Sequence, residues 1–346
     1  MNLRRILIAL CASFGCTDLS VLDQTDPLAP LPTSRTAQRW AHPELTGTTT
    51  LDSNHLQLHA TVPPRVIDCE REWPQDEAAC RDLDQDGLSD LWERMALHRL
   101  RPFVRMHHQE PLFSDYHGRV VASGRVTQSA DSHIRIFVAI AFSNDYGRCG
   151  ATAHRGDPER IAIDLVQRDS HTVEVARVYT ASHEGTALDG SLLVDEQDFA
   201  QLEFTMDEQA DMPRWVVYSS IGKHAMYPSA DACASKGGFV CLNDDCASEG
   251  DARNDLLPDV YNIGEPDSQS FEFEGIENGI ENGSENGSEN GSDDRSESRV
   301  ATPQLRRDQV WGDEDYCGDI PEHAVGSYSG ACAGPMRDKF VRDPFF

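Results

Sequence analysis

The sequence predicts a mainly β fold, an antiparallel β-sandwich with a few short helices that is stabilised by disulfides. Apolar residues alternate along several segments between residues 66 and 266, as in strands that bury one face. Turn signals separate these segments, and one clear helical pattern lies among them. Ten cysteines, in a chain that begins with an export-like segment, favour disulfide bonds.

Residues 1–16 have the pattern of an export signal. Arg4 and Arg5 precede the apolar run ILIALCASF, which is too short to span a bilayer. Small residues stand just before Cys16, so ordinary signal cleavage and lipidation of Cys16 both stay open. We therefore expect an exported protein, either a bacterial outer membrane lipoprotein or a secreted, extracellular protein. Contact with a membrane is expected only through a lipid on Cys16.

Composition divides the rest of the chain. Residues 17–65 are rich in Thr, Pro, Ser and Asp without sustained periodicity, and are expected to form a flexible tether. Residues 66–346 are expected to form one β-sandwich domain. Within it, residues 268–300 contain the acidic repeat ENGSENGSENGS and are predicted to be a disordered insertion.

The cysteines indicate a disulfide framework. Cys11 lies within the signal, and Cys16 is the candidate lipidation site. The remaining cysteines are Cys69, Cys80, Cys149, Cys233, Cys241, Cys246, Cys317 and Cys332. An even set of this kind in an exported protein predicts up to four disulfides. A zinc cluster is the alternative, and the absence of any CxxC spacing disfavours it.

The segment DLDQDGLSDLWE, residues 82–93, matches an EF-hand-like calcium loop. Its predicted ligands, at loop positions 1, 3, 5, 7, 9 and 12, are Asp82, Asp84, Asp86, the carbonyl of Leu88, Asp90 and Glu93. Gly87 occupies position 6, where the loop turns sharply. Ser89 stands at position 8, where paired EF-hands place an apolar residue, so a single Ca²⁺ loop is expected. A helix is predicted to follow over residues 91–100 and to end before Pro102.

The strongest strand signals follow this helix. Residues 134–142 have apolar residues on both faces, which predicts a central strand. Residues 159–167 alternate, as do residues 171–181 through Val173, Val175 and Tyr179, with a break at Arg177. Further strands are predicted over residues 201–207 and 214–222.

The segment AHRGDPERIAIDL, residues 153–165, places three potential metal ligands at the beginning of a strand. Asp157 and Glu159 are two residues apart and should share one strand face. Gly156 would let His154 turn back toward them, and Pro158 predicts the strand's start or an edge. Asp145 ends the preceding strand. These four groups form a candidate site for a second divalent cation, Ca²⁺ or Mg²⁺. The alternative is a loop of ion pairs with Arg155 and Arg160.

Two family resemblances bear on this site. HRGDPE is similar to the heptapeptide GHRHDWE of the necrosis- and ethylene-inducing-peptide-like proteins, secreted β-sandwich toxins with a divalent cation beside a lipid-headgroup site. More of the chain resembles the family named after vacuolar protein sorting-associated protein sixty-two. The matching segments within residues 82–266, in the family's order, are DQDGLSDLWE, RPFVRMHHQEPLF, HRGDPERIAI, SSIGKHAMYPS and LLPDVYNIGEP. The resemblance returns near the C-terminus with GPMRDKF.

The resemblance implies a cation bound by residues that match the family motif. These residues are Asp145, His154, Asp157 and Glu159, with His224 of GKHAMYP as a neighbour. His107, His108 and Glu110 lie in a matched segment and are weaker candidates. Pro158 replaces the family tryptophan and Gly156 replaces the second histidine of the heptapeptide. Toxin-like membrane attack is therefore not expected.

Three functions stay open at this point. The first is an exported, cation-binding β-sandwich that binds a lipid or glycan headgroup through its cation. The second is a metal-dependent hydrolase in which His224 or Glu159 moves a proton, although no GxSxG or HExxH motif is present. The third is a structural surface protein with purely stabilising metals. The net charge of −29 argues against a nucleic-acid partner.

Overall fold

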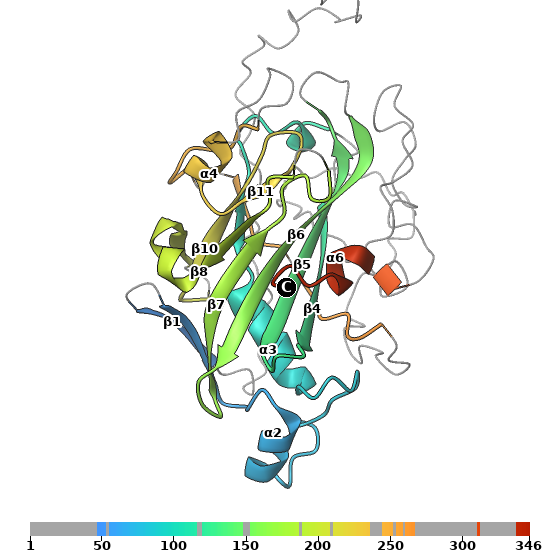
Figure 1. Ribbon diagram of the computed structural model, residues 1–346, viewed down its shortest axis with the longest axis vertical. Coiled ribbons are helices and arrows are strands. Elements are labelled where there is room, and N and C mark those ends of the chain that lie inside the picture. The colour runs from blue at the N-terminus through green and yellow to red at the C-terminus, as the bar shows by residue number, and fades with distance from the viewer. Residues whose placement is uncertain are drawn as a thin grey trace, which may run out of the picture.

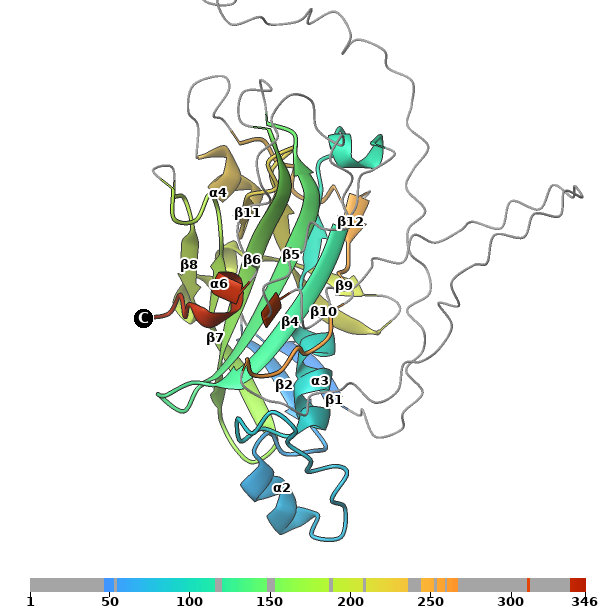
Figure 2. The same ribbon diagram turned by 90° about the vertical axis from the view of Figure 1, so that its right-hand side faces the viewer.

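Two β-sheets pack face to face in the computed structural model (Figure 1, Figure 2). The structure describes residues 47–52, 55–115, 120–147, 153–186, 189–207, 210–235, 244–251, 254–258, 260–266, 310–311 and 337–346. The export signal, the first part of the expected tether and the acidic insertion lie outside these residues. A mainly β, sandwich-like architecture with few short helices is therefore confirmed.

The larger sheet has the strand order β1-β2-β7-β6-β5-β4, with β8 paired to β7. Its strands are β1 (Gly47–Asp52), β2 (His55–Ala60), β4 (Val120–Gln128), β5 (Ile134–Asp145), β6 (His154–Gln167), β7 (Thr172–Thr180) and β8 (Leu192–Asp195). All paired neighbours in this sheet are antiparallel. The inner face carries Ile136, Val138 and Ile140 of β5 and Ile161 and Ile163 of β6 into the main core.

The smaller sheet has the order β11-β10-β3-β12, with β9 paired to β10. Its strands are β3 (Phe103–Arg105), β9 (Glu203–Asp207), β10 (Met212–Ser219), β11 (Met226–Tyr227) and β12 (Asp255–Leu256). One pair, β3 with β10, is parallel, whereas the sequence predicted antiparallel pairing throughout. This pairing joins segments more than 100 residues apart, and a strand's own alternation carries no information about its partner's direction.

The predicted helix is α3 (Asp90–Leu100), and it contributes to the main core. The Ser89 hydroxyl accepts a hydrogen bond from the Trp92 amide and caps its first turn. Leu97 lies directly against Gly124 of β4, where an added Cβ would come within 2.5 Å of a Leu97 methyl carbon. The other helices are α2 (Val66–Glu72), α4 (Ala230–Ala234), α6 (Arg337–Val341) and the 3₁₀ turns η2 (Pro111–Phe113) and η3 (Glu196–Gln201).

Two disulfides are described, Cys69–Cys80 and Cys233–Cys246. The first joins α2 to the segment before the predicted calcium loop, residues 82–93. Helix α2 projects beyond the sheets at one end in both views (Figure 1, Figure 2). The other four predicted disulfide cysteines lie outside the described residues. Among the described helices, none is long and apolar enough to cross a membrane.

The tether prediction is wrong for its C-terminal part. Strands β1 and β2 fall within residues 17–65, and β2 pairs with β7 in the larger sheet. Leu56, Leu58 and Ala60 alternate on β2 and are buried in the core. Only this short alternation signalled the strand, and the Thr- and Pro-rich composition around it obscured the signal.

Two details of the strand prediction are also corrected. Pro158 lies inside β6, which begins at His154, so it does not mark the strand's start. The edge alternative fits, because among the described strands β6 pairs at this point with β5 alone. In β7, the register shifts so that Ala176 faces no partner, because Arg177 pairs with Asp164 and Val175 pairs with Leu165. This β-bulge turns Tyr179 to the outer face, whereas simple alternation placed it with Val175.

Candidate metal centre

The carboxylate of Asp82, the first residue of the loop 82–93, stabilises the turn of that loop. Asp82 accepts hydrogen bonds from the Gln85 amide at 2.7 Å and from the Gly87 amide at 3.0 Å. Gln85 has φ 63° and Gly87 has φ 93°, so the chain reverses through a left-handed conformation that favours glycine at the second position. This is the sharp turn that the sequence predicted at position 6.

Two other carboxylates fasten the loop to the sandwich. Asp86 accepts from the Leu88 amide at 2.8 Å and from the Gln128 amide, at the end of β4, at 3.1 Å. Asp84 accepts from the Glu265 amide at 3.1 Å. The loop is thus bound to two segments that are distant in sequence.

The Leu88 carbonyl is placed as the calcium-loop hypothesis requires. Leu88 forms an antiparallel bridge with Arg65, and the flanking bonds join Val66 to Gly87 and Ser89 to Pro64. In such a pair the N–H and C=O of the central residue face away from the partner strand. The Leu88 amide accordingly donates to Asp86, so the Leu88 carbonyl also faces the loop.

Glu93 is the most informative residue of the loop. Its side chain is fully buried on α3, and neither carboxylate oxygen has a hydrogen-bond partner. One oxygen of Asp84 is likewise buried without a partner. Buried polar atoms are seldom left unsatisfied in native proteins, and a buried charge is costlier still. These oxygens therefore form a ligand set that a cation can satisfy.

The predicted loop ligands gather into one acidic cluster. Oxygens of Asp82, Asp84 and Asp86 lie within 4.8 Å of one another, and so do those of Asp84, Asp90 and Glu93. Asp90 differs from the others, because its oxygens accept from the Leu83 amide and from Arg81. Position 9 of such loops often contacts the ion through water, which this arrangement permits.

Without a cation, the environment of the cluster disfavours the ionised form of its carboxyl groups. Burial, with the charges of Asp86 and Asp82, raises the pKa of Asp84 to about 8. Burial raises the pKa of Asp86 to about 7 and that of Glu93 well above its ordinary value. A divalent cation would reverse this preference, because its charge stabilises the ionised carboxylates.

The second predicted site lies at the other end of the same strand. Gln128, beside the loop, pairs with Ile134 at the start of β5, and Asp145 ends that strand. Twelve residues of strand separate the two places by roughly 35 Å. Asp145 pairs with His154, and their side chains approach to 3.4 Å between Oδ2 and Nε2. Gly156 has φ 68°, and its carbonyl lies 2.9 Å from His154 Nδ1.

Asp157 and Glu159 share the inner face of β6, as predicted, because they pair with Phe142 and Ile140 of the core. Within the part of the chain that the structure describes, the four residues of the second site do not form a group of three or more with ligand atoms within 4.8 Å. Outside the loop, the described residues form one such group, which consists of His55, Glu174 and Glu196. The second cation stays a prediction.

Asp157 instead contacts His224. The His224 Nδ1 atom lies 2.9 Å from Asp157 Oδ2, and Nε2 lies 3.3 Å from Glu110 Oε1. His224 is fully buried, and its ring stacks on Phe142 with centroids 3.9 Å apart. Burial alone would lower the pKa of His224, but Glu110 and Asp157 raise it to about 10. The histidine is therefore an imidazolium between two carboxylates at neutral pH.

Of the weaker candidates, only Glu110 enters this buried network. It also accepts from the Gly222 amide at 2.8 Å, which fixes the turn that carries His224. His107 and His108 contact each other with ring centroids 4.3 Å apart, and His108 is exposed. Glu159 is buried with one oxygen unpartnered, and burial raises its pKa well above the ordinary value.

Sequence reasoning missed a second polar cluster near this end. Asp244 accepts hydrogen bonds from the Tyr227 hydroxyl and from Lys223, and its Oδ2 atom lies 2.9 Å from His183 Nε2. Ser182 donates to Tyr227 at 2.7 Å. These residues lie up to 62 positions apart in the sequence, and no local motif links them. The cluster forms only when distant segments come together in the fold, so the spacing of its residues in the sequence does not reveal it.

Comparison with known proteins gives no match to a family model, a curated protein or a solved structure. The function is therefore argued from the geometry of the chain itself. The family resemblance drawn from the motifs stays a prediction.

We predict that the metal-free loop makes stability fall as pH rises. Asp84 has a raised pKa in the folded protein, so between about pH 4 and pH 8 the folded state binds more protons than the unfolded chain. Urea unfolding in chelator should show wild type losing about 1–3 kcal/mol relative to Asp84→Asn between pH 5 and pH 8. A difference that is constant across this range would contradict the assignment.

We also predict that His224 is structural. His224→Gln removes the positive charge between Glu110 and Asp157 and should lower the free energy of unfolding by about 3–5 kcal/mol. His154→Gln is the matched control, because His154 is partly exposed, and it should change stability by less than about 0.5 kcal/mol. Chemical denaturation of both variants measures this, and equal losses would refute the distinction.

Proposed function

We propose that this chain is an exported, calcium-binding β-sandwich protein. The observation that carries the proposal is Glu93, fully buried with both carboxylate oxygens unpartnered and within ligand distance of Asp84 and Asp90. Calcium prefers such oxygen ligands, in a loop with this spacing and a glycine at the turn. Main-chain amides donate hydrogen bonds to Asp82 and Asp86, whereas the Glu93 oxygens have no such partner and are left to bind the ion.

The proposed ion would fix three parts of the fold to one another. Glu93 belongs to α3, Asp86 is bonded to the end of β4, and Asp84 is bonded to Glu265. A bound Ca²⁺ would join these segments through one charge centre. Its effect would be largest on the packing of α3 against the larger sheet.

Export is supported by the two described disulfides and by the acidic composition. Disulfides persist in oxidising compartments, and extracellular calcium is abundant enough to fill a loop of modest affinity. Whether Cys16 carries lipid belongs to the same proposal. The anchor would be the chain's contact with a membrane.

A lipid or glycan headgroup is proposed to bind at the opposite end, beside Asp145 and His154. Both side chains are partly open to solvent, at 13% and 35% exposure, and lie at the end of β5 and the start of β6. A second divalent cation there would bridge the carboxylate and an anionic or hydroxyl-rich headgroup. The hydrolase alternative is less well supported, because His224 and Glu159 are both buried.

Calcium titration tests the first part of the proposal. Free Ca²⁺ at 100 times its Kd should add about 2.7 kcal/mol to the free energy of unfolding of the wild-type protein. Glu93→Gln should remove this gain. Glu70→Gln, which changes an exposed acid outside the loop, should retain it. A gain that survives in Glu93→Gln would exclude the loop as the source.

Metal analysis after dialysis tests the second part. Wild type should hold two divalent cations per chain, and Asp145→Asn and Glu93→Gln should each hold one. Loss of the ion only in Glu93→Gln would leave the calcium loop standing and refute the headgroup site. Thermal melting of Asp145→Asn checks that the variant is folded.

A further inference from the structure

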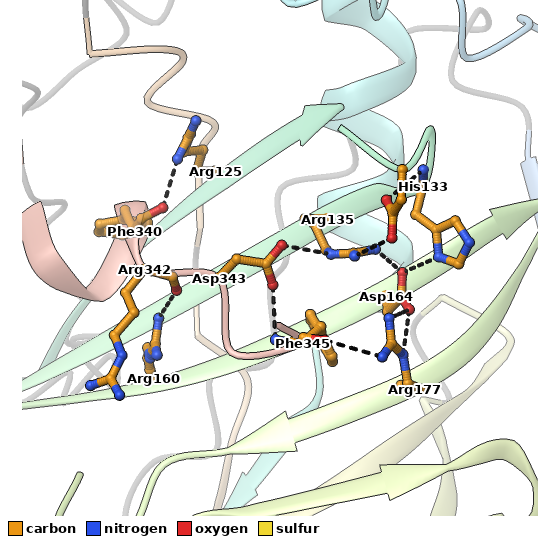
Figure 3. A network of polar contacts seen from close by, with 11 residues as sticks. Arg125, His133, Arg135, Arg160, Asp164, Arg177, Phe340, Arg342, Asp343 and Phe345 are labelled. Carbon is orange, nitrogen blue, oxygen red and sulfur yellow. Dashed lines mark hydrogen bonds and ion pairs between the residues drawn. The ribbon is translucent and has the colours of Figure 1, made fainter. Parts of the chain in front are cut away.

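Four arginines form a continuous patch on the outer face of the larger sheet. Arg125, Arg135, Arg160 and Arg177 come from β4, β5, β6 and β7, one from each of four neighbouring strands (Figure 3). The first three are buried, and the side chain of Arg177 is 25% exposed. We name this patch the arginine face.

The cover of the arginine face is residues 337–346, here called the C-terminal strap. The strap consists of α6 and the residues after it, and it lies over the middle of the sheet (Figure 1). Three arginines donate to strap main-chain carbonyls (Figure 3). The contacts are Arg125 to Phe340 at 2.6 Å, Arg160 to Arg342 at 2.5 Å and to Lys339 at 3.2 Å, and Arg177 to Phe345 at 3.4 Å. Guanidinium groups on the sheet therefore donate hydrogen bonds to main-chain carbonyls along the length of the strap.

Two phenylalanines anchor the strap. Phe340 is fully buried and Phe345 is 7% exposed, and both join a cluster on the outer face with Phe137 and Ala162. The Phe345 ring lies 4.9 Å from the guanidinium carbon of Arg135. This apolar cluster is separate from the main core between the sheets. The strap is therefore an addition to a core that is complete on the other face.

The strap also supplies one carboxylate. Asp343 accepts from Arg135 at 3.2 Å and from the Phe345 amide at 2.9 Å (Figure 3). The second bond turns the strap so that the Phe345 ring faces the arginines. Asp343, which lies between Phe340 and Phe345 in the sequence, therefore adds an ion pair to the contacts between the strap and the arginine face.

Each arginine also pairs with a carboxylate of the sheet or its loops, in addition to its contacts with the strap. Asp164, fully buried on β6, accepts from both Arg135 and Arg177. Glu184 pairs with Arg160 and Glu265 pairs with Arg125, each through both carboxylate oxygens. Removing the strap would therefore leave a preorganised row of donors above an apolar floor. A preorganised surface binds without the entropy cost of assembling it.

We propose that the arginine face is a peptide-binding site, and that residues 337–346 are its ligand. Main-chain carbonyls meet fixed guanidinium donors, two phenylalanines fill the floor, and one aspartate sets the register. Because 25 residues separate Trp311 from Arg337, the ligand is joined to the sandwich through a long connection. The same segment of a second copy of this chain therefore binds the face in trans when the chain's own strap is displaced.

The test uses the full chain with a protease recognition sequence inserted after Gly334. The site follows Cys332, so the cut frees the strap whatever Cys332 is bonded to. After cleavage, a fluorescent peptide RDKFVRDPFF is added and its anisotropy is followed. The body should stay folded by circular dichroism and should take up the peptide, while the uncut chain, whose own strap competes in cis, should take up at least about tenfold less.

Two controls make the result specific. A peptide with alanine at the positions of Phe340 and Phe345 should bind at least about tenfold more weakly, because both anchors bury their rings. An uncut chain carrying Phe340→Ala and Phe345→Ala should accept the wild-type peptide without cleavage. Equal binding of the two peptides, unfolding of the body after cleavage, or no uptake by either chain would overturn the proposal.

Discussion

The pairing of β5 with β6 is the interaction on which the rest of the molecule depends. It is antiparallel from Ile134 with Leu165 to Asp145 with His154. The inner faces of the two strands supply the centre of the core, and the outer faces carry arginines and their carboxylate partner. One end meets the acidic loop and the other meets the partly exposed pair of Asp145 and His154. A single long ladder therefore separates and orients every feature to which we assign a role.

The protein buries charge in two different ways. On the outer face, Asp164 is satisfied by Arg135 and Arg177, so the charges compensate within the chain. In the loop, Glu93 and Asp84 have no basic partner in the described contacts, and their oxygens face other acids. The first arrangement is complete as it stands, whereas the second needs a positive charge from outside. Buried ionic groups are stable only when such compensation exists.

The sequence predicted the features that depend on residues close together in the chain. The alternation of residues 134–142 predicted the central strand, and the spacing of residues 82–93 predicted the acidic cluster and the sharp turn at Gly87. The pairing of Glu110 with His224 could not be predicted, because it depends on how segments 114 residues apart meet. The parallel pairing of β3 with β10 and the polar cluster around Asp244 have the same origin. No periodicity or spacing records such long-range contacts.

The bulge at Ala176 has a consequence for how β7 tolerates changes in length. The two halves of this strand present opposite alternation, so Val175 and Val178 both face the interior although they are three residues apart. A deletion of one residue here would restore an unbroken strand and keep Arg177 and Tyr179 on the outer face, because Ala176 is the extra residue. Substitution at Ala176 keeps the count and the orientation. In an evolving lineage the bulge is therefore the place where this strand can lose a residue and keep the orientation of its other side chains.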